Sequence, residues 1–119
     1  MGIDKRKKDK GGKKMPTVKV TKDNFDEEIT KYNGVAIIDF WADWCGPCRM
    51  LSPELEKISK EEENIKVCKV NVDEERELAR KFGISSIPTV LYAKNGEIQK
   101  KTVGYMGKKF ILDVVSQLK

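Results

Sequence analysis

Two cysteines separated by two residues, Cys45 and Cys48, are the side chains of this sequence best suited to chemistry. A thiolate is a strong nucleophile, and two thiols at this spacing can alternate between a dithiol and a disulfide. Pro47 suits the first turn of a helix, where its missing N–H group would have had no partner. Gly46 lets backbone and a partner molecule approach sulfur closely. The motif predicts sulfur redox chemistry at the start of a helix, with Cys48 one turn further along and more buried than Cys45.

The segments on either side of this motif predict a strand and a helix. The apolar run Val35–Trp41 predicts a buried strand, and Leu51, Leu55 and Ile58 recur on one face of the helix that follows. Cys45 then lies at the helix N-terminus, where unpaired N–H groups and the helix dipole stabilise an anion. This arrangement can lower the pKa of its thiol by roughly one unit.

The same spacing also occurs in structural disulfides and in zinc sites. A zinc site needs four ligands, usually with a second cysteine pair or two histidines. The sequence has one further cysteine, Cys68, and no histidine. A zinc site within one chain is therefore disfavoured and Cys–His catalysis is excluded, whereas a zinc site shared between two chains stays open. We predict that Cys68 is a buried core residue, with a regulatory thiol as the alternative.

Asp39 and Lys69 are charged residues within predicted strands that could take part in this chemistry. Asp39 lies within the apolar run, and burial there would raise its pKa toward the range that suits proton transfer near neutral pH. The alternative is a structural aspartate with hydrogen-bond or ion-pair partners. Lys69 lies in a second predicted strand, where a buried ammonium group would need a partner. The alternative is a lysine whose end group reaches solvent.

The hydrophobic periodicity predicts nine elements in the order βαβαβαββα. This order implies parallel pairing followed by an antiparallel hairpin, hence an α/β fold in which helices flank both faces of a mixed sheet. The predicted strands lie at 18–20, 35–41, 65–72, 89–92 and 97–103, and Asn95-Gly96 forms the hairpin between the last two. The first helix is capped by Asp23 or Asn24 and has Phe25, Ile29 and Tyr32 on one face, and the second is the helix after the cysteines. The third helix is capped by Asp73 and ended by Gly83, and the last has one face made of Phe110, Ile111, Val114, Val115 and Leu118.

The chain has 119 residues, enough for one domain, which we predict at 15–119. Residues 1–14 hold seven basic and two acidic residues, 7 − 2 = +5, which equals the net charge of the whole chain. Nucleic acid, a membrane surface or an acidic partner could bind such a segment, but a solvated, disordered tail, or a true start at Met15, is the favoured interpretation.

The sequence shows no membrane-spanning run and no secretory signal, so we expect a reducing cytoplasm and no membrane insertion.

The motif Trp44-Cys45-Gly46-Pro47-Cys48 resembles the active site of the thioredoxin family. The resemblance includes the preceding strand with its aspartate, the later Ile87-Pro88-Thr89 and Asn95-Gly96, and Gly104, and it extends over roughly residues 17–118. It implies the thioredoxin fold and an enzyme that reduces protein disulfides. It also implies a reversible Cys45–Cys48 disulfide in place of any organic cofactor or metal.

The resemblance implies a role for each matching residue. Cys45 is the nucleophile and Cys48 the resolving thiol. Asp39 accepts the proton of Cys48, and Lys69 lies near Asp39 and lowers its pKa.

The resemblance further implies a docking surface. The peptide bond between Ile87 and Pro88 would be cis and lie beside the cysteines, so that the Ile87 backbone could pair with an extended substrate. Trp44, Ile87 and Gly104 would form the apolar surface that meets partner proteins. The implied partners are protein disulfides and a thioredoxin reductase or equivalent electron donor, and we expect a monomer.

Two other functions remain open. The first is a binding or assembly module that uses the docking surface without turnover, which activity retained after Cys45→Ser plus Cys48→Ser would favour. The second is a protein disulfide oxidase or isomerase, which a measured reduction potential would distinguish from a reductase.

Overall fold

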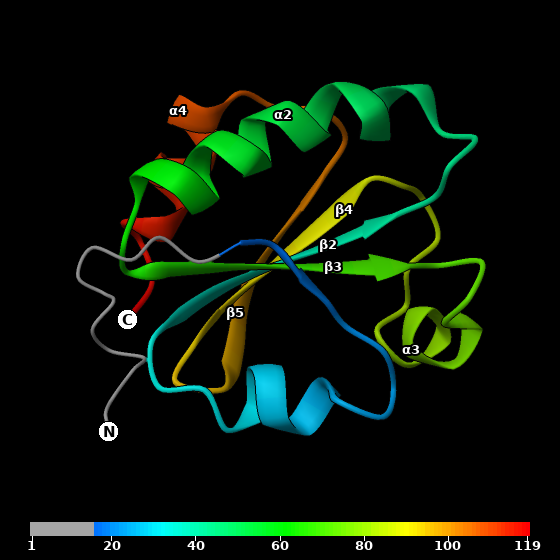
Figure 1. Ribbon diagram of the computed structural model, residues 1–119, viewed down its shortest axis with the longest axis horizontal. Coiled ribbons are helices and arrows are strands. Elements are labelled where there is room, and N and C mark those ends of the chain that lie inside the picture. The colour runs from blue at the N-terminus through cyan, green and yellow to red at the C-terminus, as the bar shows by residue number, and fades with distance from the viewer. Residues whose placement is uncertain (1–15) are drawn as a thin grey trace.

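The computed structural model describes residues 16–119, so the predicted basic tail at 1–14 and the suggested start at Met15 lie outside the described residues. Figure 1 shows a central sheet with helices above and below it. The elements are β1 (Val18–Lys19), the π-helix η1 (Asp26–Thr30), β2 (Val35–Trp41), α2 (Gly46–Glu61), β3 (Ile65–Asn71), α3 (Arg76–Lys81), β4 (Thr89–Lys94), β5 (Glu97–Val103) and α4 (Lys108–Val115). This order confirms the predicted α/β class and mixed sheet.

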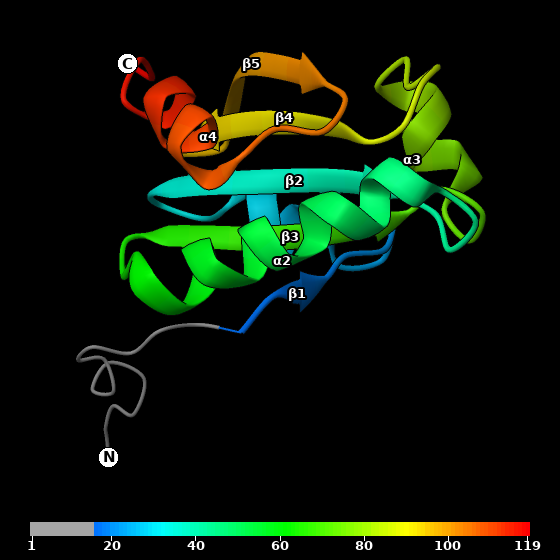
Figure 2. The ribbon, with the colours of Figure 1, turned by 90° about the horizontal axis from the view of Figure 1, so that it is seen from above.

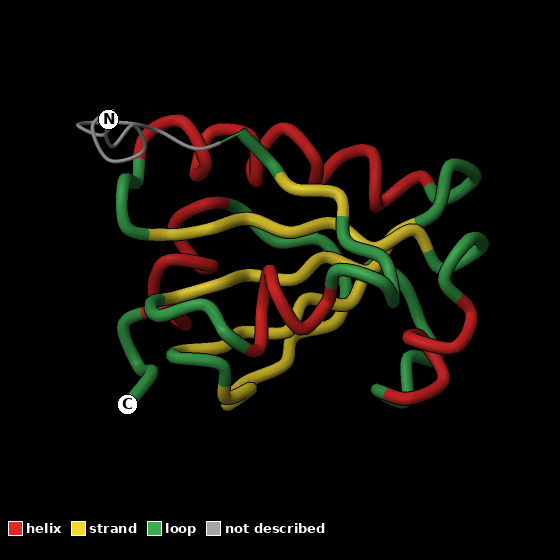
Figure 3. The backbone as a smooth tube through the Cα atoms, turned by 60° about the horizontal axis from the view of Figure 1, so that its bottom comes forward, coloured by secondary structure: helices red, strands yellow, loops and turns green. Residues whose placement is uncertain are grey.

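The five strands lie in the order β1-β3-β2-β4-β5, with β2 at the centre. β2 pairs in parallel with β3 and antiparallel with β4, and β4 pairs antiparallel with β5. Figures 1 and 2 show α2 and α4 together on one face of the sheet. Figure 3 shows η1 across the near side of the strands, with α2 running along the top. The two faces are therefore covered by different helices, as predicted.

The side chains of β2 alternate between the two faces because successive residues of a strand point in opposite directions. Ile37 packs with Leu51 and Leu55 of α2, whereas Ile38 and Phe40 belong to the opposite cluster. Asp39 has the same parity as Ile37, so its carboxyl group lies on the face that α2 covers. β2 thus places the Asp39 carboxyl group between the sheet and α2, the helix that begins at the cysteines.

The first helix differs from the predicted capped α-helix. Its backbone forms a π-helical turn in which the Lys31 N–H donates to the Asp26 oxygen at 2.8 Å. The Asn24 side chain accepts from the Thr21 N–H at 2.7 Å and donates to the Lys19 oxygen at 3.0 Å. Neither Asp23 nor Asn24 caps the helix, because the Asn24 amide is engaged in the preceding turn.

Three smaller predictions also need correction. Asp73 does not cap a helix: α3 begins at Arg76, and its N-terminus has no side-chain cap. β3 ends at Asn71, one residue before the predicted end. Phe110 is 54% exposed, because Ile111 and Val114 supply the buried stripe of the shorter helix α4.

The hairpin between β4 and β5 forms at the predicted dipeptide. Asn95 has φ = 52° and Gly96 has φ = 83°, the left-handed pair that a tight hairpin requires. A Cβ atom on Gly96 would overlap the carbonyl oxygen of Thr30. Glycine is needed there both for the backbone angle and for the close approach of η1.

Candidate active site around the Cys45–Cys48 disulfide

Cys45 and Cys48 form a disulfide at the N-terminus of α2, with their Cα atoms 5.2 Å apart. Cys45 is the N-cap residue in an extended conformation, and its sulfur accepts the Cys48 N–H at 3.2 Å. Pro47 lies in the first turn, as predicted. A sulfur atom at Cys45 is therefore held where the helix N–H groups can stabilise it as a thiolate once the disulfide is reduced.

The expected difference in burial between the two cysteines is not found. Cys45 is 4% exposed and Cys48 is 3% exposed. The disulfide draws the two sulfur atoms together, so they share one environment in this oxidised form. The distinction between an accessible nucleophile and a sheltered resolving thiol does not appear in these exposures.

The carboxyl group of Asp39 is fully buried, and neither of its oxygens has a hydrogen-bond partner among the described residues. Burial raises the pKa of Asp39 to about 6, while the positive charge of Lys69 opposes the increase. This is the direction expected from the sequence. A carboxyl group with this pKa changes protonation state just below neutral pH, which suits proton transfer.

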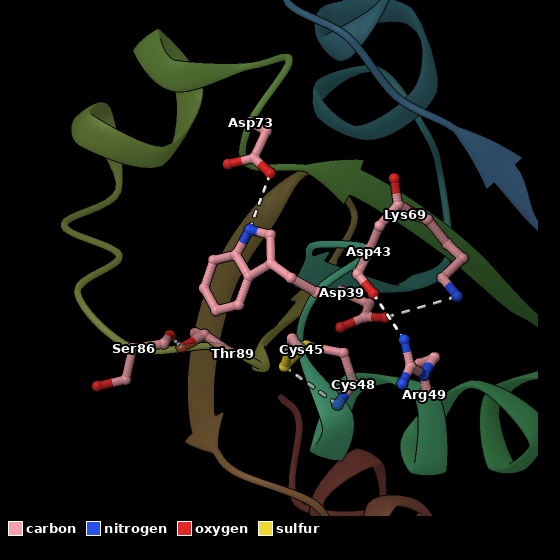
Figure 4. The surroundings of a disulfide bond; sticks show 10 residues. Asp39, Asp43, Cys45, Cys48, Arg49, Lys69, Asp73, Ser86 and Thr89 are labelled. Atoms are coloured by element: carbon pink, nitrogen blue, oxygen red, sulfur yellow. Dashed lines mark hydrogen bonds and ion pairs between the residues drawn. A yellow bond between two sulfur atoms is a disulfide. The ribbon is translucent and has the colours of Figure 1, made fainter.

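Lys69 lies opposite Asp39 in the parallel β2–β3 register. Its Nζ atom is 3.8 Å from Oδ2 of Asp39, 3.0 Å from Oγ of Ser52 and 5.3 Å from the centre of the Trp41 ring. Its side chain is 18% exposed. Figure 4 shows the lysine extending toward the carboxylate behind the disulfide. The structure therefore brings Asp39 and Lys69 together, and it adds Ser52, which the sequence analysis did not identify.

The indole of Trp44 is 68% exposed beside the disulfide. Its Nε1–H donates to Oδ2 of Asp73 at 3.0 Å (Figure 4). This hydrogen bond fixes an aromatic surface next to the sulfur atoms. Asp73 is thus a second residue that the sequence analysis did not place at the site, because a helix-cap pattern suggested a different role.

The peptide bond between Ile87 and Pro88 is cis. The Gly104 N–H donates to the Pro88 oxygen at 2.8 Å, which joins two segments of the expected docking surface. Ser86 and Thr89, on either side of this peptide, belong to the surroundings of the disulfide (Figure 4). Thr89 Oγ1 donates to the Ser86 oxygen at 2.6 Å and closes the loop. The loop before β4 thus lies in the surroundings of the disulfide.

Cys68 is buried on the face of the sheet opposite Asp39, within the cluster that contains Ile38 and Phe40. Burial raises the pKa of its thiol to about 12. This confirms its placement in the core. Among residues 16–119, no three acidic or cysteine side chains gather as ligands for a metal ion. No helix in that range is long and apolar enough to cross a bilayer.

The sequence and the fold are similar to those of known thioredoxins. A family model described as Thioredoxin matches residues 16–117. The thioredoxin of Rickettsia bellii is 46% identical over 98 residues, which are 82% of this chain and 93% of that protein. The thioredoxin of Bacillus subtilis is 41% identical over 104 residues, 87% of this chain and 98% of that protein. A solved mutant thioredoxin from Halobacterium salinarum NRC-1 has a TM-score of 0.78 and 32% identity, covering 85% of this chain and 88% of that chain.

Proposed function

This chain belongs to the thioredoxin family, and we propose that Asp39 is the proton acceptor in its reaction. The protein is a thiol-disulfide oxidoreductase that reduces protein disulfides through Cys45 and Cys48. The observation that supports a role for Asp39 is its buried carboxyl group, which lacks any hydrogen-bond partner in the described chain. Burial makes this carboxylate a stronger base than one in water, although the nearby Lys69 ammonium group offsets part of the effect.

The proposed cycle moves two electrons from the cysteine pair to the substrate. The Cys45 thiolate attacks one sulfur of a substrate disulfide, and the other substrate sulfur leaves as a thiolate. Asp39 takes the proton from the Cys48 thiol, and the Cys48 thiolate then attacks the Cys45 sulfur. The second substrate thiolate leaves, and the Cys45–Cys48 disulfide seen here is the product on the enzyme. Both electrons come from sulfur, so the proposed cycle needs no organic cofactor or metal.

We propose that Trp44, Ile87, Pro88 and Gly104 receive the substrate protein. The exposed Trp44 indole and the loop that ends at the cis peptide bond support this assignment, because both lie around the disulfide. A thioredoxin reductase or equivalent dithiol donor would return electrons to the pair. The cytoplasm is the proposed compartment, since thiols are kept reduced there.

The role of Asp39 is tested by the rate at which Cys48 closes on a mixed disulfide of Cys45. We expect Asp39→Asn to slow this step about 10²-fold or more at pH 7, the usual contribution of a positioned acid or base. The loss should shrink as the pH approaches the pKa of the Cys48 thiol, because hydroxide then removes the proton. Stopped-flow fluorescence of the preformed mixed disulfide measures the step.

Asp43→Asn is the matched control, because Asp43 is an exposed carboxylate in the same loop as Trp44. It should leave the rate within about twofold of the wild-type value, as is usual for an exposed substitution. An unchanged rate in Asp39→Asn would remove Asp39 from the mechanism while leaving the family assignment intact.

A further inference from the structure

The ammonium group of Lys69 is the ion-pair partner of Asp39, but its hydrogen bond goes to Ser52. It donates a hydrogen bond to Ser52 Oγ at 3.0 Å, yet it stops 3.8 Å from Asp39 Oδ2. This second separation is too long for a hydrogen bond. Both oxygens of Asp39 are left without a donor although a group with three donors lies beside them. The lysine is thus within hydrogen-bond distance of the Ser52 hydroxyl and outside that distance from the carboxylate.

We propose that Ser52 is a positioning residue that holds the Lys69 ammonium group away from Asp39 and so keeps the carboxylate free to accept a proton. The inference rests on the proposed function of Asp39 as the proton acceptor. Ser52 lies on α2, one helical turn after Cys48, so the helix that carries the resolving thiol also carries the group that restrains the lysine. Ser52, which restrains the lysine, and Cys48, which donates the proton, thus lie on the same helix.

Lys69 is the charged group that forms an ion pair with Asp39. β3 contributes Lys69 opposite Asp39, and β4 contributes the uncharged Val90 on the other side. α2 contributes the cysteine pair, which does not titrate in the disulfide form, and the neutral Ser52. Burial sets the raised pKa of Asp39, and its distance from the Lys69 ammonium group decides how much of that increase is offset.

Loss of the hydroxyl should let the lysine move inward. Without the hydroxyl, the attraction between the opposite charges of Lys69 and Asp39 acts with no hydrogen bond to Ser52 opposing it, and this attraction is stronger in a site shielded from water. The outer side of Lys69 faces a surface cavity of about 300 Å³ shared with Trp41 and Asp43, which offers the opposite route. We expect the ammonium group to move toward Asp39 and not into the cavity, because the Asp39 oxygens, which have no hydrogen bond, are the nearest charged acceptors.

The test is the pKa of Asp39 in the oxidised protein, where neither Cys45 nor Cys48 titrates. The ¹³C signal of the Asp39 carboxyl group is followed by NMR in the wild type and in Ser52→Ala. In the wild type the pKa is about 6. In Ser52→Ala we expect it to fall by about one unit, a tenfold loss of proton affinity, because the ammonium group then donates directly to the carboxylate. An unchanged or raised pKa would overturn the inference.

Three further variants separate positioning from a general disturbance of the helix. Ser52→Thr keeps the hydroxyl and should restore the wild-type pKa. Ser59→Ala removes a hydroxyl from the same helix that bonds the Glu56 oxygen, and it should leave the pKa unchanged. In a Lys69→Met background, Ser52→Ala should have no further effect, since the proposal acts only through the lysine. A shift that persists in that background would also overturn it.

The same variants distinguish this inference from the role of Asp39. If the pKa falls in Ser52→Ala and closure of the Cys45–Cys48 disulfide slows, both hold. If the pKa falls and the closure rate at pH 7 does not change, Ser52 positions Lys69 as proposed, and it is the proton-accepting role of Asp39 that fails.

Discussion

Asp39 is a buried carboxyl group whose oxygens have no hydrogen-bond donor among residues 16–119, so its ionisation affects the stability of the protein. Its pKa is raised from 3.8 to about 6. The folded state therefore binds a proton more tightly than the unfolded chain between these values. Sheltering the charged form costs free energy of folding, and the cost is present whenever Asp39 is ionised.

This gives a pH-dependent prediction for Asp39→Asn. Well below pH 3.8 the carboxyl group is protonated in both the folded and the unfolded state, and its burial as an anion costs nothing. As the pH rises through 6 the cost increases to about 3 kcal/mol, the equivalent of the pKa difference. An amide carries no charge, so the variant should gain about 2–3 kcal/mol over the wild type at pH 8 and little at pH 4. Urea unfolding at the two pH values measures this, and an equal gain at both would contradict it.

The sequence identifies the residues whose types conflict with their surroundings, and it misses those defined by distant partners. Asp39 and the cysteine pair are evident from the apolar run and the helix start that surround them. Ser52 and Asp73 are not, because their contacts join residues 17 and 29 positions apart. Periodicity describes one element at a time, so hydrogen bonds between elements leave no trace in it.

At the scale of elements, the turn between β4 and β5 is where backbone conformation limits the sequence most strictly. Gly96 combines φ = 83° with a position against the Thr30 carbonyl oxygen of η1. Gly83 offers a matched comparison, because it has φ = 65° and open space around the site of a Cβ atom.

We therefore predict that Gly83→Ala costs about 1–2 kcal/mol, the usual cost of a left-handed conformation for an L-residue. Gly96→Ala should cost clearly more, about 3 kcal/mol or above, because the new methyl group must also displace η1. Chemical denaturation of the two variants measures the difference. Equal costs would show that η1 moves aside without a loss of stability.

An element is predicted more accurately when its conformation and bounds are determined by its own residues than when they depend on contacts with other elements. β2 has the predicted bounds because its residues are mostly apolar and the five central ones are buried, on both faces of the sheet. The first helix is correctly placed but is a π-helix, since side-chain spacing indicates a face and does not indicate which carbonyl each N–H reaches. The short helix α3 starts later than predicted, because the expected cap Asp73 is bonded to Trp44.

At the scale of the whole molecule, the sheet provides the rigid frame and one end of it carries the site. α2 begins next to the end of β2, and the loop before β4 lies in the surroundings of the disulfide (Figure 4). Two segments far apart in the chain, the turn from β2 into α2 and the loop before β4, thus meet around the disulfide. The order of elements predicts this architecture, whereas the predicted boundary of the domain and the role of residues 1–14 stay predictions.

The most direct test of the account is the reduction potential of the Cys45–Cys48 pair. The protein is equilibrated with defined ratios of dithiol to disulfide, and tryptophan fluorescence, to which the adjacent Trp44 contributes, reports the oxidised fraction. A reductase requires a strongly reducing pair, and we predict a value near the roughly −270 mV that is typical of thioredoxins. A value near about −120 mV, as in strong disulfide oxidants, would contradict the assignment as a reductase.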